Sequence, residues 1–374
     1  MKFVISTQEF VFLVNKCLNV VGTKGTSPIL SNILIEAFND ELILSATDLT
    51  VGVRCYTEAK ILEEGATTLP AKKLGQLVRE LTSINLEFST NEKEITEILA
   101  GSSRFKLLGM HRKDFPNLPS MSDAIQIKAS QSELKDMLHR TAFAVSREDN
   151  RYVLTGVNMH IANGIASFVG TDGKRLSRCH MPVNLDKSFT GSYIIPIKAV
   201  EEIVKNLNDE GDAVISLLPD KIGIEASQTM IVTKLLSGEY PDVTRIIPEQ
   251  MEISVALHRE ELMTLLRQVA LFVSDMQHSV RLSFTPGELR LSANTMDIGE
   301  GKVSMPVNYH GQRMDIAFNP NFFLDILRHC NSEAVQMGVT DAYNPGIITD
   351  AEQAVKLSTA RSLFVLMPLR LNEE

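Results

Sequence analysis

The chain has 374 residues, of which 44% are hydrophobic and 22% are charged, and its net charge is −9. This composition is that of an ordinary soluble globular protein and excludes a disordered or fibrous chain. The length exceeds what one hydrophobic core usually serves, so two or three domains are expected. An acidic surface repels duplex DNA on average, so any DNA contact has to be local and basic.

The sequence has no run of 18 apolar residues, and its N-terminal stretch turns polar at Ser6, too early for a signal peptide. We therefore expect a cytoplasmic protein without membrane contact. The four cysteines form no C-x-x-C motif and have no histidine at ligand spacing, so we expect buried free thiols, no metal and no cofactor. They are Cys17, Cys55, Cys179 and Cys330.

The first elements in chain order are a predicted strand over residues 2–5 and a helix after it. Ser6 and Glu9 have the spacing of a capping box at the start of this helix. Apolar residues then recur at helical spacing. They are Phe10, Leu13, Val14, Cys17 and Val21. Next comes a predicted hairpin, residues 33–38 and 41–46, with its turn at Asn39 and Asp40.

A second helix in this first segment follows Pro70, because proline suits the first turn of a helix. Its apolar stripe is Leu74, Leu77, Val78 and Leu81. Another hairpin pattern follows, and the segment closes at residues 115–119 with an aromatic residue and prolines.

The same order of elements occurs twice more. Ser130 and Glu133, then His258 and Glu261, precede helical stripes in which Leu134 and Leu262 are equivalent to Phe10. The equivalent hairpin turns are Asn163-Gly164 and Pro286-Gly287, and the equivalent proline-led helices follow Pro196 and Pro320. After Pro196, the stripe Val200, Ile203, Val204, Leu207 lies opposite a charged stripe of Lys198, Glu201, Glu202 and Lys205. After Pro320, the stripe is one residue closer to the proline: Phe323, Ile326, Leu327 and Cys330.

The recurrence predicts three tandem copies of about 124 residues, too long for a solenoid repeat, so each copy is a domain. The expected fold class is α+β, with two amphipathic helices per domain packed on one side of antiparallel sheets. We place the domains at residues 1–123, 124–250 and 251–374, with linkers at residues 115–119 and 240–248. The apolar run at residues 363–371 is, from its pattern alone, a buried last strand more often than part of a surface groove.

Catalytic motifs are weak in this sequence. The loop at residues 22–27 lacks phosphate-loop spacing, and no serine or histidine lies in a known hydrolase or metal motif. Asp48, after Ala46 and Thr47, matches Asp172, after Gly170 and Thr171, which leaves a metal-dependent nuclease open, but the third copy has Ala293-Asn294-Thr295 there and no acid. We interpret both acids as turn residues that accept hydrogen bonds from their own backbone, and the chain as noncatalytic.

The charged faces of the six helices carry a net charge of +2 in a chain of −9, a modest segregation of basic residues. Contact with nucleic acid is therefore one interpretation, and a protein scaffold that never meets DNA is another.

Several motifs spread over the whole chain resemble the bacterial DNA polymerase III β subunit family, the replicative sliding clamps. They are Met1-Lys2-Phe3, Pro28-Ile29-Leu30, Thr47-Asp48-Leu49, Gly65-Ala66-Thr67-Thr68, Asp114-Phe115-Pro116-Asn117-Leu118, Arg151-Tyr152, Thr171-Asp172-Gly173-Lys174-Arg175-Leu176, Tyr240-Pro241-Asp242 and Met367-Pro368-Leu369-Arg370-Leu371. The resemblance implies a head-to-tail homodimer of three-domain chains, closed into a ring whose helices surround double-stranded DNA. Such a ring holds DNA topologically and needs only weak contacts that are blind to sequence.

The resemblance also implies the sites and partners. Candidate DNA contacts are Lys24, Lys72, Lys73, Arg79, Arg147, Arg151, Lys198 and Lys205. The polymerase catalytic subunit, the clamp loader and other proteins with short clamp-binding peptides are expected to dock in an apolar groove between the second and third domains. Its candidate residues are Leu154, Thr171, Gly173, Lys174, Arg175, Leu176, Pro241, Arg245, Ile246, Val365, Met367, Pro368, Leu369 and Arg370.

At the dimer interface, the resemblance places Phe105 and Leu107 of one chain against Phe272 and Val273 of the other. Asn372, Glu373 and Glu374 extend past the point where many relatives stop, and their acids are expected to weaken the binding of acidic peptides.

Overall fold

The computed structural model describes the chain except for residues 23–26, 249–250, 275–277, 351–359 and 371–374. Lys24 and the acids Glu373 and Glu374 thus lie outside the described residues. The chain divides into two compact units, Met1–Lys135 with Lys198–Leu235, and Asp136–Ile197 with Leu236–Glu374. None of the described helices is long and apolar enough to cross a membrane.

The first unit holds two antiparallel sheets. The five-stranded sheet has the order β5 (Lys60–Glu63), β1 (Lys2–Ser6), β7 (Asn85–Thr90), β8 (Ile95–Ala100), β9 (Ser103–Leu108). The eight-stranded sheet has the order β10 (Ile125–Ser130), β15 (Asp212–Leu217), β16 (Lys221–Ala226), β17 (Thr229–Lys234), β4 (Val51–Glu58), β3 (Glu41–Thr47), β2 (Asn32–Phe38), β6 (Gly65–Pro70). Pairing of β17 with β4 joins strands of the second sequence copy to strands of the first.

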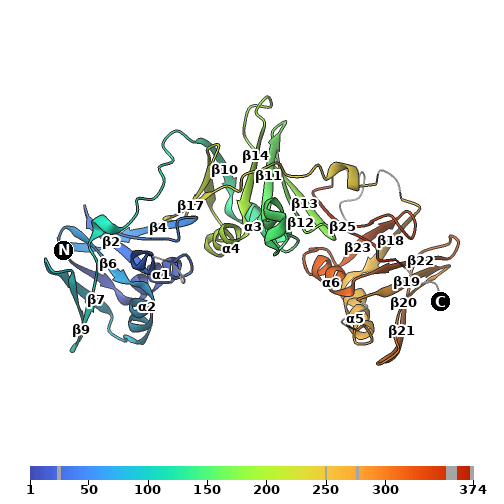
Figure 1. Cartoon of the computed structure of the whole chain (residues 1–374), viewed down its shortest axis with the longest axis horizontal. Helices are drawn as coiled ribbons and strands as arrows, with labels where there is room; N and C mark the ends of the chain where they lie inside the picture. The colour runs from blue at the N-terminus through green and yellow to red at the C-terminus, as the bar shows by residue number, and fades with distance from the viewer. Residues whose placement is uncertain (23–26, 249–250, 275–277, 351–359, 371–374) are drawn as a thin grey trace. The chain divides into compact units, whose positions relative to one another are not determined.

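Helices α1 (Thr7–Leu18) and α2 (Ala71–Glu80) cover these sheets in the first domain (Figure 1). The predicted stripe of α1 is buried, and Gly75 of α2 lets the side chain of Leu18 approach the helix closely. The predicted capping box is wrong, because Ser6 is the N-cap residue but its side chain makes no capping hydrogen bond. Apolar burial, rather than the cap, therefore fixes this helix on the sheet.

The second unit has the same construction. Its eight-stranded sheet has the order β14 (Gly191–Pro196), β11 (Gly156–Ala162), β12 (Ile165–Thr171), β13 (Arg175–Pro182), β25 (Ser362–Leu366), β24 (Gly346–Asp350), β23 (Ala334–Val339), β18 (Ile253–His258). Its four-stranded sheet has the order β21 (Gly299–Pro306), β20 (Glu288–Thr295), β19 (Val280–Thr285), β22 (Met314–Phe318). Pairing of β13 with β25 joins the second copy to the third.

Helices α5 (Arg259–Ala270) and α6 (Pro320–Arg328) lie side by side against the sheets of the third domain (Figure 1). The His258 side chain caps α5 by accepting a hydrogen bond from the Glu261 N–H, so the third copy keeps the predicted start signal. Asn319 caps α6 in the same way. The predicted apolar residues of both helices form one core with the strands around them.

The middle domain contributes α3 (Gln131–Ala142) and α4 (Ile197–Asn206). Pro70 and Pro196 are the last residues of strands, whereas Pro320 is the first residue of its helix, which explains the one-residue offset of the third stripe. Glu202, predicted on the charged face of α4, is instead buried, with one carboxylate oxygen bonded to Lys205. Thus the buried face of α4 is wider than its apolar stripe.

A buried ion pair ties α3 to the third domain in the second unit. Arg140 donates to Asp350 at 2.6 Å, and both side chains are almost fully enclosed. The other carboxylate oxygen of Asp350 accepts the backbone N–H groups of Asn331 and Ser332. Because each buried charge has a partner, loss of either one leaves the other uncompensated.

The predicted hairpin turns and thiols agree with the structure. Asn39, Asp40 and Asn163 have the positive φ angles of tight hairpin turns, as has Gly287. All four cysteines are free and buried.

Candidate functional site

The basic residues of α2 are available at the surface of the first unit. Lys72 and Lys73 are exposed on the helix face opposite its buried residues. Arg79 is also exposed, and its Nε donates to Asn15 of α1 at 3.1 Å. This helix accounts for the whole positive balance counted over the six helices, so it is the strongest of the candidate DNA contacts.

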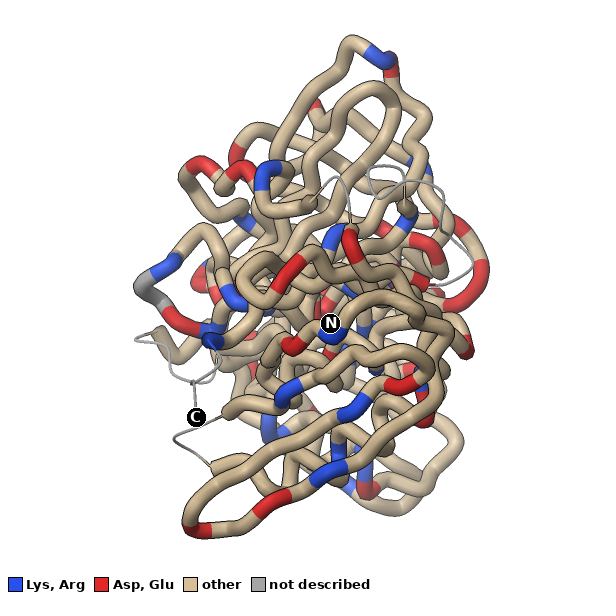
Figure 2. Tube along the Cα trace, turned by 90° about the vertical axis from the view of Figure 1, so that its right-hand side faces the viewer, with Lys and Arg blue, Asp and Glu red and all other residues tan. Residues whose placement is uncertain are grey.

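The two basic candidates of α4 already have acidic partners. Lys198 forms an ion pair with Asp48, and Lys205 pairs with Glu202 at 2.7 Å. Both lysine side chains remain about half exposed, so their charges still reach solvent. Any attraction that they exert on phosphate is reduced by these partners. Basic and acidic residues are scattered among each other along the trace in Figure 2.

Asp48 and Asp172 are turn residues, as interpreted from the sequence. Asp48 accepts the N–H groups of Thr50 and Val51 at 2.9 and 2.8 Å. Asp172 accepts those of Lys174 and Arg175 at 2.9 and 3.0 Å. No cluster of three or more His, Cys, Asp or Glu side chains suited to a metal ion occurs in the described part of the chain. The geometry therefore gives no support to a nuclease.

Asp48 has a lowered pKa. Partial burial alone would raise the pKa, but the hydrogen bond from Lys198 and those from the Val51 and Thr50 backbone outweigh it. The carboxylate is thereby held ionised beside the lysine.

The remaining DNA candidates lie in the second unit. Arg147 is exposed. Arg151 donates from Nη1 to the Asp172 carbonyl at 3.2 Å, and its guanidinium covers Gly173, where a Cβ would be 2.3 Å from Nη1. Arg151 is thus placed against the turn predicted for peptide binding, which its sequence position did not indicate.

The predicted peptide-binding residues surround the junction of β13 and β25. Beneath the surface lies a buried apolar cluster: Val169, Leu176, Val243, Ile347, Leu363 and Val365. Tyr240 and Ile247 of the linker pack against it. The Met367 N–H donates to the Lys174 carbonyl at 3.0 Å, which fixes the chain after β25 to the 171–176 turn. The structure therefore brings these distant segments together.

Above this cluster, apolar side chains reach solvent. Ile246 is 40% exposed, and Met367 and Leu369 are each 37% exposed. We call these three residues, with Gly173 and Lys174, the β25 surface. The apolar run at the C-terminus thus has two parts, because Ser362–Leu366 form a core strand, whereas Met367 and Leu369 after it are exposed.

The other predicted members differ in how accessible they are. Buried ones are Leu154, Thr171, Leu176 and Val365; Pro368 is half-buried; Pro241 and Arg245 are exposed. Arg245 pairs with Asp242 at 3.3 Å at the rim. Arg370 lines a polar hollow on the four-stranded sheet.

Arg175 was predicted in the peptide-binding groove, but its guanidinium is directed into the protein. It pairs with Asp172 at 3.3 Å and with Asp325 of α6 at 2.6 Å, and it donates to the Phe143 carbonyl at 3.0 Å. It also lies over the rings of Phe143 and Phe322. Arg175 is therefore a positioning residue that holds the turn against α6.

The predicted dimer contacts lie at two sheet edges. Phe105 and Leu107 are half-buried on β9, the last strand of the five-stranded sheet. Phe272 packs on Gly301 of β21, the last strand of the four-stranded sheet, where a Cβ would be 2.4 Å from its ring. Sequence reasoning missed further exposed apolar side chains near these edges, because a residue between turns gives no periodic signal. They are Leu108 in the first unit, and Leu271, Met296 and Ile298 in the second.

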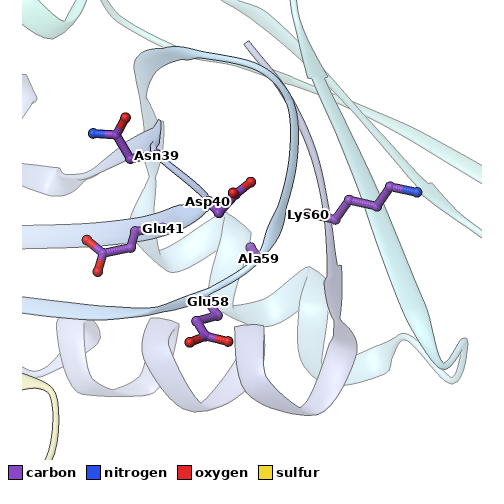
Figure 3. Close-up of a pocket in the computed structure, with 6 residues that line it drawn as sticks. All are labelled: Asn39, Asp40, Glu41, Glu58, Ala59 and Lys60. Carbon is purple, nitrogen blue, oxygen red and sulfur yellow. The ribbon is translucent and has the colours of Figure 1, made fainter.

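Figure 3 shows a hollow at the turn between β2 and β3, lined by Asn39, Asp40, Glu41, Glu58, Ala59 and Lys60. Its side chains diverge rather than converge on one point, and none was predicted to have a function. We assign it no role.

The sequence matches the family described as DNA polymerase III beta subunit along most of its length. Its N-terminal domain matches residues 1–119, its central domain residues 128–242 and its C-terminal domain residues 244–360. The chain is 54% identical to the beta sliding clamp of Chlamydia pneumoniae and 52% identical to that of Chlamydia muridarum, over 100% of each chain.

Solved structures agree with this match. The sliding clamp (DNA polymerase III subunit beta) of Pseudomonas aeruginosa bound to griselimycin is 27% identical, with a TM-score of 0.94 over 99% of this chain and 100% of that one. The DNA polymerase sliding clamp of Bacillus subtilis has the same TM-score at 24% identity and covers 100% of both chains, which supports the fold.

The ion pair of Asp48 with Lys198 gives a prediction about stability and pH. Since the pKa of Asp48 is lowered on folding, its contribution is present above the unfolded pKa, about 4, and is lost as the pH falls through the folded value. Asp48→Asn should lower the free energy of unfolding at pH 7 by roughly 0.5–1 kcal/mol. Denaturant titration should show this gap narrowing below about pH 4. The prediction would be contradicted if the difference in unfolding free energy between wild type and variant stayed constant to pH 2. It would also be contradicted if the exposed control Asp220→Asn lost the same stability with the same dependence on pH.

Proposed function

This chain belongs to the DNA polymerase III beta subunit family and is a noncatalytic DNA sliding clamp, and we propose that two copies close into a ring around duplex DNA. The observation that carries this proposal is the match to beta sliding clamps over the full length at 54% identity. Because the chain belongs to a family of DNA sliding clamps, the alternative interpretation of a protein scaffold that never meets DNA is dropped. The ring tethers the replicative polymerase and so raises its effective concentration at the primer end.

Weak contacts with DNA fit such a ring. The exposed Lys72 and Lys73 supply local positive charge, whereas Lys198 and Lys205 are partly neutralised by their acidic partners. A protein that held DNA by six to ten phosphate contacts alone would lose about 10³ to 10⁵ in affinity as salt rises from about 50 to 200 mM. Phosphate contacts also carry no sequence information. We propose that encirclement, not affinity, keeps the clamp on DNA.

The first test is retention on circular DNA. Clamp loaded by its clamp loader onto nicked circular DNA should stay bound during gel filtration, and linearisation with a restriction enzyme should release it rapidly, because the ring slides off the ends. The measured quantity is the fraction of protein that elutes with DNA before and after cutting. Equal retention on circular and linear DNA would rule out encirclement.

We propose that the β25 surface binds short peptides of the polymerase, the clamp loader and other partners. The buried cluster below it supplies a rigid base, and Ile246, Met367 and Leu369 offer exposed aliphatic contacts for apolar anchors. Lys174, exposed beside them, favours acidic partners.

The matching prediction concerns Ile246→Ala/Met367→Ala. Removing both aliphatic side chains should weaken binding of a short peptide with Leu and Phe anchors by about tenfold or more. Fluorescence anisotropy measures this on the full-length chain. The control Ile165→Ala removes an exposed side chain at the opposite end of β12 from Thr171 and should leave the affinity unchanged. Equal affinities for the wild type and the double variant would place the peptide elsewhere.

We further propose that the dimer forms by pairing the edge of β9 with the edge of β21 of the second copy. An open edge presents unpaired N–H and C=O groups, and exposed apolar side chains gather near both edges. The contact is heterologous, and it closes after two subunits.

Sedimentation over a concentration series tests this dimer. Leu107→Asp on β9 should shift the chain to monomers at concentrations where the wild type is dimeric, because a carboxylate would be buried in the interface. Leu62→Asp lies on β5, at the opposite edge of the same sheet, and should leave the dimer intact. If both variants dissociate alike, or neither does, the β9 edge is not the interface.

Domain limits and location complete the proposal. We place the three domains at residues 1–123, 124–250 and 251–374, close to the ranges matched by the family. A cytoplasmic location follows from the proposed work on DNA with the replicative polymerase.

A further inference from the structure

The outer face of the four-stranded sheet in the second unit carries a polar hollow beside the proposed sites, which shares Arg370 with the predicted peptide-binding residues and Met296 with the exposed apolar residues near the β21 edge. Its basic lining residues are Arg281, Arg290, Lys302, Arg313 and Arg370, and we call this set the basic basin. The inward residues of the same strands, among them Leu282 and Leu291, are fully buried in the core. Strand alternation therefore fixes the basic side chains on the opposite, solvent-facing side.

Strand register groups these cations. Ser292 lies opposite both Arg281 and Lys302 on the neighbouring strands, and Ser283 lies opposite Arg290. Adjacent strands are about 4.8 Å apart, so cations of one row, separated by a serine, are spaced by roughly 10 Å. Ser283 is buried, whereas Ser292 is partly exposed between Arg281 and Lys302.

The basin is positive in an acidic chain. Five cations line it against two carboxylates, those of Glu288 and Glu300. These acids pair with Arg290 and Lys302, but the pairs are exposed and therefore weak.

Two of the five basic side chains, Arg281 and Arg370, have no acidic partner within ion-pair distance in the described residues. Arg313 pairs with Asp315, which Arg281 also faces. Within the described residues, the side chains of Arg281 and Arg370 make no hydrogen bond and no ion pair. The local field therefore favours an anionic ligand.

The chemistry of the lining favours carboxylates over nucleic acid. Guanidinium groups bind the paired oxygens of carboxylates and of phosphates equally well, so the rest of the lining has to distinguish the two. No aromatic side chain lines the basin, so single-stranded nucleic acid would lack the stacking platform on which its bases normally bind. An acidic stretch of peptide is therefore the ligand that fits.

The basin also adjoins the β25 surface through the chain itself. Leu369 belongs to that surface, and its N–H donates to the Ala317 carbonyl of β22 at 2.8 Å. The next residue, Arg370, lines the basin. The path from Met367 to Arg370 spans three residues, at most roughly 10 Å. A peptide on the β25 surface would reach the basin with a short extension.

We propose that the basic basin binds acidic residues that flank the apolar anchors of a partner peptide on the β25 surface. This inference rests on the peptide binding proposed above. The basin adds a second, electrostatic part to the peptide site. It favours partners that carry acidic residues next to their apolar anchors.

The test compares three synthetic peptides by fluorescence anisotropy on the full-length chain. The first has only Leu and Phe anchors; the second adds four glutamates through a short glycine spacer, at either end; the third replaces the glutamates with glutamines. In low salt, the glutamate peptide should bind about tenfold more tightly than the glutamine peptide, as expected for several exposed ion pairs. High salt should remove the difference.

Two double variants test whether the tighter binding of the glutamate peptide, called the gain below, comes from the basin. Arg281→Gln/Arg290→Gln should abolish it while leaving the anchor-only peptide unaffected. Arg54→Gln/Lys60→Gln removes the same charge from exposed positions of the first unit and should keep the gain. If the glutamate and glutamine peptides bind equally, or if both double variants lose the gain alike, the basin proposal is overturned.

Failure of the β25 surface gives a different result. If the anchor-only and glutamine peptides do not bind, the peptide surface proposed above is wrong. If the glutamate peptide still binds in that case, and its binding depends on Arg281 and Arg290, the basic basin binds acidic residues without the β25 surface. If none of the three peptides binds, both the β25 surface and the basin proposal are overturned.

Discussion

The pairing of β13 with β25 is the interaction on which the proposed peptide-binding surface depends. It joins strands from the second and third sequence copies into one sheet, and it places the 171–176 turn beside the chain that leaves β25. The buried Arg140 and Asp350 reinforce the same junction, and Arg175 ties the turn to α6. Most charged residues here thus hold the scaffold, and the surface left for partners is largely aliphatic.

The basic residues differ in whether they have acidic partners nearby. Lys198 and Lys205 are held by acids at short range, whereas Lys72 and Lys73 and the basic basin keep much of their charge. An acidic chain with a few unneutralised basic areas avoids nonspecific attraction to polyanions over its whole surface. It can still orient an anionic partner at chosen places. Weak electrostatics is compatible with motion along DNA because no single contact has to be broken at high cost.

Local patterns predicted the helices, the hairpins and the roles of Asp48 and Asp172, since these features depend on residues close in sequence. The same patterns missed the burial of Glu202 and the inward direction of Arg175, because both depend on neighbours supplied by distant segments. Ser6 shows a further limit: it lies at the N-cap, yet its side chain makes no capping bond. Pairing of β4 with β17 could not be read from any periodicity. The proposed dimer edges and the basic basin could be found only from the strand order.

The two inter-copy junctions also constrain how the chain acquires its structure. Cys55 pairs with Thr229, and Arg175 pairs with Leu366, so each junction closes a very long loop. Contacts of such high sequence separation lower the folding rate because chain entropy is lost before they form. Local hairpins and helices are therefore expected to form first and the junctions late. Until then β4 and β13 present open edges, which makes the unfinished chain prone to mispairing and aggregation.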